Sequence, residues 1–321
     1  MPQARDIASA IPGKAPAKIG ADALFKWFTI IAALVVPIIM AGIFWELLSL
    51  SWLALKTFGW KFFISEAWNP VTQNFGAASS IFGTVVSTLI AMLLAVPMSI
   101  VIALFLVELA PPRISKVVGS LIELLAAIPS IIYGMWGLFV FAPFMATYVQ
   151  PFLGQYLGFL PLFQGPPMGI GMLTAGIILA FMVLPFITAI CRDVFALVPA
   201  VLKESGYGVG ATTWEVTYKI TIPYGVVGVL GGIFLGLGRA LGETMAVTFV
   251  IGNSHRISAS LFAPGNTIAS ALANEFAEAT DPLFISSLIA LGLVLFIFTF
   301  FVQVVSQLML RRMYRGWSIK V

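Results

Sequence analysis

Two residue types are nearly missing from this chain, and each scarcity excludes a class of site. There is one cysteine, Cys191, and one histidine, His255. A single cysteine excludes a disulfide within the chain, and the two residues cannot form the cysteine or multi-histidine clusters that hold metals. The chain also lacks the Gly-x4-Gly-Lys-Ser/Thr pattern of a phosphate-binding loop for ATP, and it contains no catalytic triad. We therefore expect no metal site, no catalytic site and no cofactor in this chain.

Charged residues are also scarce. They make up 9% of the 321 residues, whereas apolar residues make up 60%, and the mean hydropathy is +1.05. A soluble protein of this length needs far more charge to cover its surface. The composition therefore indicates an integral membrane protein of one domain. The net charge of +4 reflects basic loops rather than binding to nucleic acid.

Six apolar runs are each long enough to cross a bilayer, which requires about 20 residues. The first is too long for a signal-peptide core and lacks a clear cleavage site, so we expect it to remain as an anchor. The predicted fold is all-α, with a six-helix transmembrane domain at 24–310 between an N-terminal tail (1–23) and a C-terminal tail (311–321). The predicted spans are 24–55, 81–109, 117–145, 168–190, 224–252 and 283–310.

The distribution of Lys and Arg predicts the orientation of these spans. Thirteen basic residues fall in or directly beside the two tails and the two even-numbered loops, counting Lys26 at the start of the first span, against three in the odd-numbered loops. Cytoplasmic segments carry the excess of basic residues. Both termini and the loop after the fourth span are therefore expected in the cytoplasm. The remaining basic residue, Arg239, lies inside the fifth span.

One polar stretch, residues 199–223, interrupts the apolar sequence. It reads PAVLKESGYGVGATTWEVTYKITIP and contains Lys203, Glu204, Glu215 and Lys219. Because it lies between two apolar runs that can each cross a bilayer, we expect it to lie in water. Taken alone, it could be an ordinary amphipathic loop between membrane helices.

The spacing within this stretch resembles a cytoplasmic motif of the permease subunits of ABC importers. That motif is Glu-Ala-Ala, three residues, Gly, nine residues, and then Ile-x-Leu-Pro. Here two Ala are replaced by Ser and Gly, which keeps the motif compact where a partner approaches, and Leu is replaced by Ile. The resemblance implies a type I importer permease fold, with a coupling helix within 199–223 that inserts into a groove on an ATPase subunit. The motif positions are Glu204, Ser205, Gly206, Gly210, Ile220 and Pro223.

Arg239 needs a separate explanation, because it falls near the middle of the predicted fifth span. A guanidinium there costs at least ~2.5 to 3.5 kcal/mol on insertion scales, so it should face a partner or a watery path. Glu243 follows four residues later, which predicts the same helical face. One interpretation is a structural ion pair that holds helices together. The other is an anion-translocation site, because Arg can donate two parallel hydrogen bonds to an oxyanion.

Two further segments narrow the resemblance. Residues 238–247, GRALGETMAV, and residues 123–134, ELLAAIPSIIYG, are similar to stretches of phosphate-specific ABC permeases. In that family an Arg and a Glu in the first segment are linked to phosphate passage, and they correspond to Arg239 and Glu243. We place the expected substrate pathway at Arg239, Glu243 and Thr244. A carboxylate at Glu243 could accept a hydrogen bond from the proton that phosphate carries and sulfate lacks, or it could hold Arg239 at rest.

The resemblance also implies partners. They are a second, similar permease, a dimer of ATPase subunits that binds ATP and Mg, and an extracytoplasmic phosphate-binding protein, all at the bacterial inner membrane. Residues 253–282 carry the most polar external loop and could receive the binding protein, although a solvated connector is the alternative. Glu108 and Glu123 flank a short loop containing Arg113 and Lys116, and we expect them to form interfacial pairs.

Other functions remain open at this point. The same machinery could carry another oxyanion, such as sulfate or molybdate. An ion-coupled secondary transporter would work without ATP, but it leaves the spacing from Glu204 to Pro223 unexplained. A membrane sensor or scaffold without transport activity is a third possibility.

Overall fold

The computed structural model describes residues 19–318, with side chains described for residues 22–313. The chain divides into two compact units, residues 1–49 and 50–321. Most of the predicted N-terminal tail (1–23) and the end of the predicted C-terminal tail (311–321) lie outside the described residues. In the first unit, the described residues form one apolar helix, the N-terminal part of α1 (Ile19–Phe58), which contains Pro37.

The second unit is almost entirely helical, and η1, η2, η3 and η5 are π-helical turns while η4 is a 3₁₀ turn. A short hairpin, which the sequence did not predict, pairs β1 with β2 in antiparallel register, Trp68 opposite Phe75. In chain order the elements are α2 (Lys61–Ile64), β1 (Trp68–Asn69), β2 (Asn74–Phe75), α3 (Ala78–Leu104), η1 (Phe105–Leu109), α4 (Pro112–Ala126), α5 (Ser130–Trp136), η2 (Gly137–Phe141), α6 (Ala142–Phe144), η3 (Met145–Val149), α7 (Gln150–Leu157), η4 (Pro161–Phe163), α8 (Met172–Ala196), α9 (Ala200–Gly208), α10 (Thr213–Val216), η5 (Thr217–Thr221), α11 (Ile222–Leu241), α12 (Met245–Ile251), α13 (Ile268–Glu275) and α14 (Pro282–Ser318).

Six helical segments of the described chain are long and apolar enough to cross a membrane, which confirms the predicted number. The third runs from Ser130 to Leu157 rather than over 117–145. The difference arises at Pro129, which has no N–H to donate and disfavours helical backbone in the residue before it. The helix α4 therefore ends at Ala126 and is a separate element.

The fifth span also differs from the prediction, because it runs from Thr213 to Leu241 rather than over 224–252. It starts earlier because Thr212 and Glu215 form a reciprocal capping box that begins α10 within the polar stretch. It ends earlier because Gly242 leaves the helical conformation, and α12 begins only at Met245. A break thus separates α11, which carries Arg239 in its last turn, from α12.

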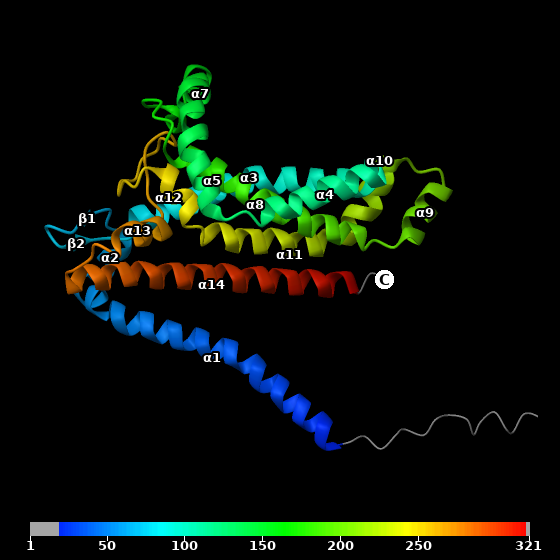
Figure 1. Cartoon of the computed structure of the whole chain (residues 1–321), viewed down its shortest axis with the longest axis horizontal. Helices are drawn as coiled ribbons and strands as arrows, with labels where there is room; N and C mark the ends of the chain where they lie inside the picture. Colours follow the sequence, from blue (N-terminus) through cyan, green and yellow to red (C-terminus); the bar gives the residue numbers. More distant parts are fainter. Residues whose placement is uncertain (1–18, 319–321) are drawn as a thin grey trace, which may run out of the picture. The chain divides into compact units, whose positions relative to one another are not determined.

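The helix α8 forms the centre of the second unit. In its most apolar window 61% of residues are buried, against 22% to 28% for the other candidate spans of this unit. It packs against α3, α4, α5, α11 and α12. In Figure 1, α9 lies at one end of this bundle, and the β-hairpin and α13 lie at the opposite end. We call these the α9 end and the hairpin end.

Near the hairpin end, α3 approaches the loop before α13 so closely that only glycine fits. A Cβ atom on Gly83 would lie 1.9 Å from the carbonyl oxygen of Asn266. The adjacent Thr84 hydroxyl accepts a hydrogen bond from the Ile268 N–H at 3.0 Å. The absence of a side chain at Gly83 therefore allows α3 to receive the start of α13.

This contact predicts that Gly83→Ala destabilises the protein by about 1–3 kcal/mol, the usual penalty for overpacking. Gly231→Ala is the matched control, because Gly231 is also inside a helix but its added Cβ would meet nothing within 4 Å. The control should be neutral or stabilising by about 0.4–1 kcal/mol. Thermal unfolding of the two detergent-purified variants measures the difference, and equal melting temperatures would contradict the expectation.

Candidate functional site

The predicted coupling segment contains a short helix, α9, that ends in a tight glycine turn. Gly210 has a φ of +85°, a left-handed conformation that glycine adopts without a Cβ clash. The Ala211 N–H donates to Gly206 O at 3.1 Å, and the Gly210 N–H donates to Tyr207 O at 2.9 Å. These are the two hydrogen bonds of a Schellman motif, which reverses the chain after a helix. Gly210 is therefore a structural requirement of the motif.

The turn folds α9 back onto the segment that follows it. A Cβ atom on Gly206 would lie 2.8 Å from Ile220 Cδ1 and 3.0 Å from Val216 Cγ2. Two motif positions that are 14 residues apart, Gly206 and Ile220, therefore pack together. Pro223 lies where η5 passes into α11. The motif spacing thus corresponds to one folded helix–turn–helix unit.

The outer side of this unit presents both polar and apolar side chains. Glu204 and Ser205 are exposed on α9. Val201, Val209 and Trp214 are 69%, 86% and 71% exposed. A groove of about 420 Å³ beside α9 is lined in part by Gly206, Gly210 and Ile220. Large exposed apolar groups next to a groove are typical of a protein-binding surface.

Arg239 lies in the last turn of α11 and is exposed in this chain. Its guanidinium carbon lies 5.3 Å from the centre of the Phe186 ring of α8. This distance fits a cation–π contact, which holds the cation without consuming its N–H donors. Within the part of the chain whose side chains are described, no carboxylate lies within ion-pair distance of Arg239. Its donors are therefore available to an anion.

The prediction that Glu243 lies on the same helical face as Arg239 is wrong. The helix ends at Leu241, so the spacing of four residues no longer places the two side chains on one face. Both residues are described, and no hydrogen bond or ion pair joins them. Instead, Glu243 Oε1 accepts a hydrogen bond from the Ala246 N–H at 3.1 Å, at the start of α12. Thr244 lies in the break between the helices and is partly buried.

Residues 123–134, the second segment that resembles the phosphate-specific permeases, reach this break at their C-terminal end. A Cβ atom on Gly134 of α5 would lie 2.7 Å from Phe249 Cδ2 and 2.9 Å from Met245 O, so α5 and α12 pack in direct contact. Phe186, which carries the cation–π contact, had no signal in the sequence that distinguished it from other apolar residues of its span.

The acidic residues at the α9 end are paired, but with other partners than the sequence suggested. Glu108 binds Lys203 of α9 at 2.7 Å, and Glu123 binds Arg192 of α8 at 2.6 Å. Neither pair involves Arg113 or Lys116, the basic residues between Glu108 and Glu123. The sequence could not reveal these partners because each lies more than 60 positions away.

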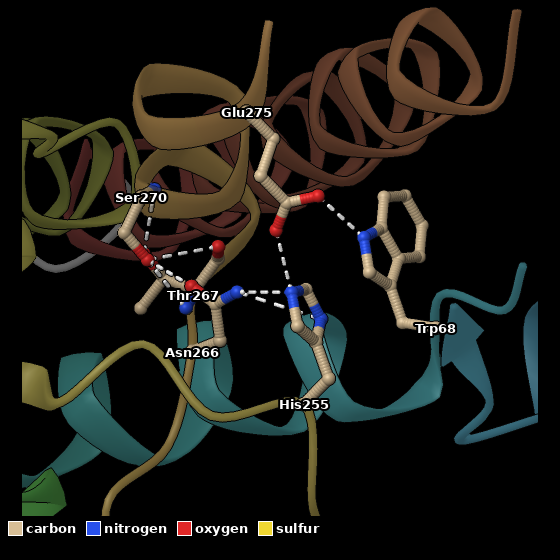
Figure 2. Close-up of polar contacts among 6 residues, drawn as sticks. All are labelled: Trp68, His255, Asn266, Thr267, Ser270 and Glu275. Carbon is tan, nitrogen blue, oxygen red and sulfur yellow. Dashed lines mark hydrogen bonds and ion pairs between the residues drawn. The ribbon is translucent and has the colours of Figure 1, made fainter. Parts of the chain in front are cut away.

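The polar residues near the hairpin end bond mainly to one another (Figure 2). His255 Nε2 donates to Glu275 Oε1 at 2.6 Å, and Trp68 Nε1 donates to Glu275 Oε2 at 2.5 Å. The His255 and Trp68 rings are stacked, and Asn266 Nδ2 lies 3.0 Å from His255 Nε2. This part of the predicted landing surface is therefore an internal network that ties the hairpin to α13. Across the described residues, no group of three or more His, Cys, Asp or Glu is arranged to hold a metal ion.

The glycine turn leads to a prediction. Gly210→Ala forces a Cβ into left-handed backbone at a cost of about 1–2 kcal/mol, and local opening of α9 should become roughly 5- to 30-fold more frequent. Hydrogen exchange of the amides in residues 200–212, followed by mass spectrometry, measures this. Gly208→Ala is the matched control, since Gly208 also has no neighbour within 4 Å of an added Cβ but lacks the positive φ. Equal exchange in both variants would contradict a role for the turn.

Comparison with known proteins places this geometry in a family. The family described as "Binding-protein-dependent transport system inner membrane component" matches residues 95–314, which include the α9 segment and Arg239. A protein of Mesorhizobium japonicum named phosphate transport system permease protein PstC is 56% identical over 295 residues, covering 91% of this chain and 90% of the relative. The protein of the same name from Pasteurella multocida is 52% identical and covers 91% and 92%.

Solved structures agree on the fold. A chain of the bacterial alginate ABC transporter, in complex with an alginate-bound periplasmic protein, superposes with a TM-score of 0.61 at 17% identity, covering 91% of this chain and 97% of that one. A second structure of an alginate ABC transporter gives 0.59, also at 17% identity, and covers 92% and 98%. The fold is therefore that of a type I ABC importer permease, as predicted. This chain belongs to the family of binding-protein-dependent transport system inner membrane components, alongside the PstC proteins.

Proposed function

We propose that this chain is a permease subunit of an ABC importer for inorganic phosphate. The observation that carries the proposal is Arg239, a guanidinium that stands beside a helix break and has no described carboxylate partner. Curated relatives at 56% and 52% identity bear the name phosphate transport system permease protein PstC, which supports phosphate as the anion.

Arg239 suits an oxyanion for a physical reason. A planar guanidinium can donate two parallel hydrogen bonds to one oxyanion, and it remains protonated at any physiological pH. The Phe186 ring holds the cation from one side through its π electrons, which leaves the N–H edge free. Arg239 is exposed in the single chain, so we place the pathway between this chain and a second, similar permease.

Glu243 and Thr244 contribute specificity in this proposal. Glu243 Oε1 is engaged by the Ala246 N–H, which fixes the carboxylate at the break and leaves Oε2 able to accept another hydrogen bond. Phosphate at neutral pH still carries a proton that it can donate to such an oxygen, whereas sulfate carries none. Sulfate would meet only repulsion from the carboxylate, so Glu243 acts against the competing anion.

Energy comes from partner chains in this proposal. A dimer of ATPase subunits binds ATP and Mg, and this chain has no ATPase site of its own. The exposed Val201, Val209 and Trp214 around α9 support docking of one ATPase subunit there, because apolar groups of this size are unfavourable in water. An extracytoplasmic phosphate-binding protein docks at the hairpin end, on residues that the internal network leaves exposed, such as Arg256 and Glu278.

The transport cycle follows from this arrangement. ATP binding closes the ATPase dimer and moves α9, and the motion opens the pathway toward the binding protein. Released phosphate passes Arg239 and enters the cell when the pathway opens inward. The proposed location is the bacterial inner membrane, with both termini in the cytoplasm, as the excess of Lys and Arg in those segments supports.

The proposal predicts that Arg239→Gln abolishes most ATP-driven uptake of phosphate. Loss of a charge-assisted contact to the anion is worth roughly 1.5–3 kcal/mol, or about 10- to 150-fold in rate. Uptake of labelled phosphate and labelled sulfate by the reconstituted complex is the measurement, with the ATPase rate and subunit assembly recorded alongside.

Arg312→Gln is the matched control, because it removes the same charge from an exposed residue near the C-terminal end of α14. It should leave phosphate uptake unchanged. Normal phosphate uptake by Arg239→Gln would refute the site. Sulfate uptake by the unmodified complex would agree with an ABC importer but would contradict phosphate as its substrate. Uptake without ATP would favour an ion-coupled secondary transporter.

A separate prediction concerns selectivity. Glu243→Gln keeps an oxygen for the Ala246 N–H but removes the negative charge, so sulfate should compete with labelled phosphate more strongly, by roughly 5- to 150-fold. Competition is measured as the sulfate concentration that halves phosphate uptake. If Glu243→Gln leaves both uptake and rejection of sulfate intact, Glu243 does not select the anion.

A further inference from the structure

At the α9 end, one buried carboxylate connects three elements that the sequence separates widely. Glu108, in the π-helical turn η1, binds Lys203 Nζ of α9 at 2.7 Å through Oε1. The same oxygen accepts a hydrogen bond from the Thr221 hydroxyl of η5 at 2.9 Å. The Glu108 and Lys203 side chains are only 6% and 18% exposed, and Thr221 is fully buried. We call these three residues the Glu108 junction.

The burial of the junction separates it from an ordinary surface ion pair. An exposed pair contributes little, but removal of one partner from a buried pair leaves an uncompensated charge and is strongly destabilising. Lys203 and Glu204 are neighbours on α9, yet Lys203 points to Glu108 while Glu204 is exposed. The inner side of α9 is therefore held by a directional bond, and its outer side remains free for a partner.

Two features suggest that the elements at the junction move. Glu108 and Thr221 both lie in π-helical turns, which are rare and occur often at functional sites. A crevice of about 350 Å³ also separates the end of α3 from α10 and η5, with apolar walls that include Leu104, Phe105 and Trp214. Glu108 lines this crevice, so a polar bond spans two surfaces that are otherwise incompletely packed.

We propose that the Glu108 junction transmits the movement of α9 to the membrane helices. When a partner displaces α9, Lys203 moves with it. The displacement passes through the bond between Lys203 and Glu108 to α3, and through the bond between Glu108 and Thr221 to α11. Arg239 lies in the last turn of α11, so the junction connects the docking segment to the helix that carries the pathway residue. Glu108, Lys203 and Thr221 are positioning residues, because they touch neither the anion nor ATP. This inference rests on the proposed docking of an ATPase at α9.

The test uses the complete complex in liposomes and measures labelled phosphate imported per ATP hydrolysed. Glu108→Gln keeps an oxygen for Thr221 but removes the charge that binds Lys203. We expect phosphate imported per ATP to fall at least about fivefold, which corresponds to a typical coupling between sites. Lys203→Met should give a similar loss, Thr221→Val a smaller one, and Lys203→Arg should retain the ratio.

The matched control is Glu123→Gln. It breaks another interhelical pair near the same end, at 2.6 Å, that does not involve α9. Its phosphate-to-ATP ratio should stay at the unmodified value. A cysteine at the exposed Val209, cross-linked to the ATPase subunit, reports docking in each variant, and melting temperature reports folding.

Each outcome separates the two proposals. A lower ratio in variants that still fold, assemble and cross-link at Val209 supports transmission through the junction. An unchanged ratio in Glu108→Gln and Lys203→Met overturns it, as does a loss of cross-linking, because the junction would then only keep α9 folded. Failure of the unmodified complex to cross-link at Val209, or to import phosphate with ATP, would instead refute the proposed function.

Discussion

A charge among apolar helices must find a partner, and the architecture at both functional regions follows from this constraint. At the α9 end, Glu108 is buried and is neutralised by Lys203, so α9 is bonded to the membrane helices. In the last turn of α11, Arg239 receives only an aromatic face from Phe186. One charge is therefore satisfied within the chain, and the other retains the capacity to bind an anion.

The helix break after Arg239 matters as much as the charge itself. Gly242 ends α11, and Thr244 lies between the two helices. Glu243 accepts a hydrogen bond from an N–H in the first turn of α12. Backbone outside a helix is tolerated at membrane depth only where protein or a water-filled path surrounds it. The break is packed against α5 at Gly134, so it belongs to the protein interior on that side. Its open side is where we place the pathway.

Most of the fold followed from simple sequence patterns. Six long apolar runs predicted six spans, and the resemblance of residues 204–223 to the importer-permease motif predicted a separate helix, now seen as α9. The errors were at proline and glycine. Pro129 moved the third span, and Gly242 shortened the fifth, because a hydropathy pattern records which residues prefer lipid but not where hydrogen bonding within the helix stops.

The sequence by itself indicated a membrane protein, and it predicted that the polar stretch 199–223 lies in water and that Arg239 needs an explanation, since these depend only on side-chain solvation and spacing. Only the tertiary structure decided the partners. The pairing of Glu108 with Lys203, the contact of Arg239 with Phe186, and the separation of Glu243 from Arg239 depend on how distant helices pack and where each one ends. Packing brings together residues that are close in space but far apart in the sequence, so a sequence pattern does not reveal which residues will meet.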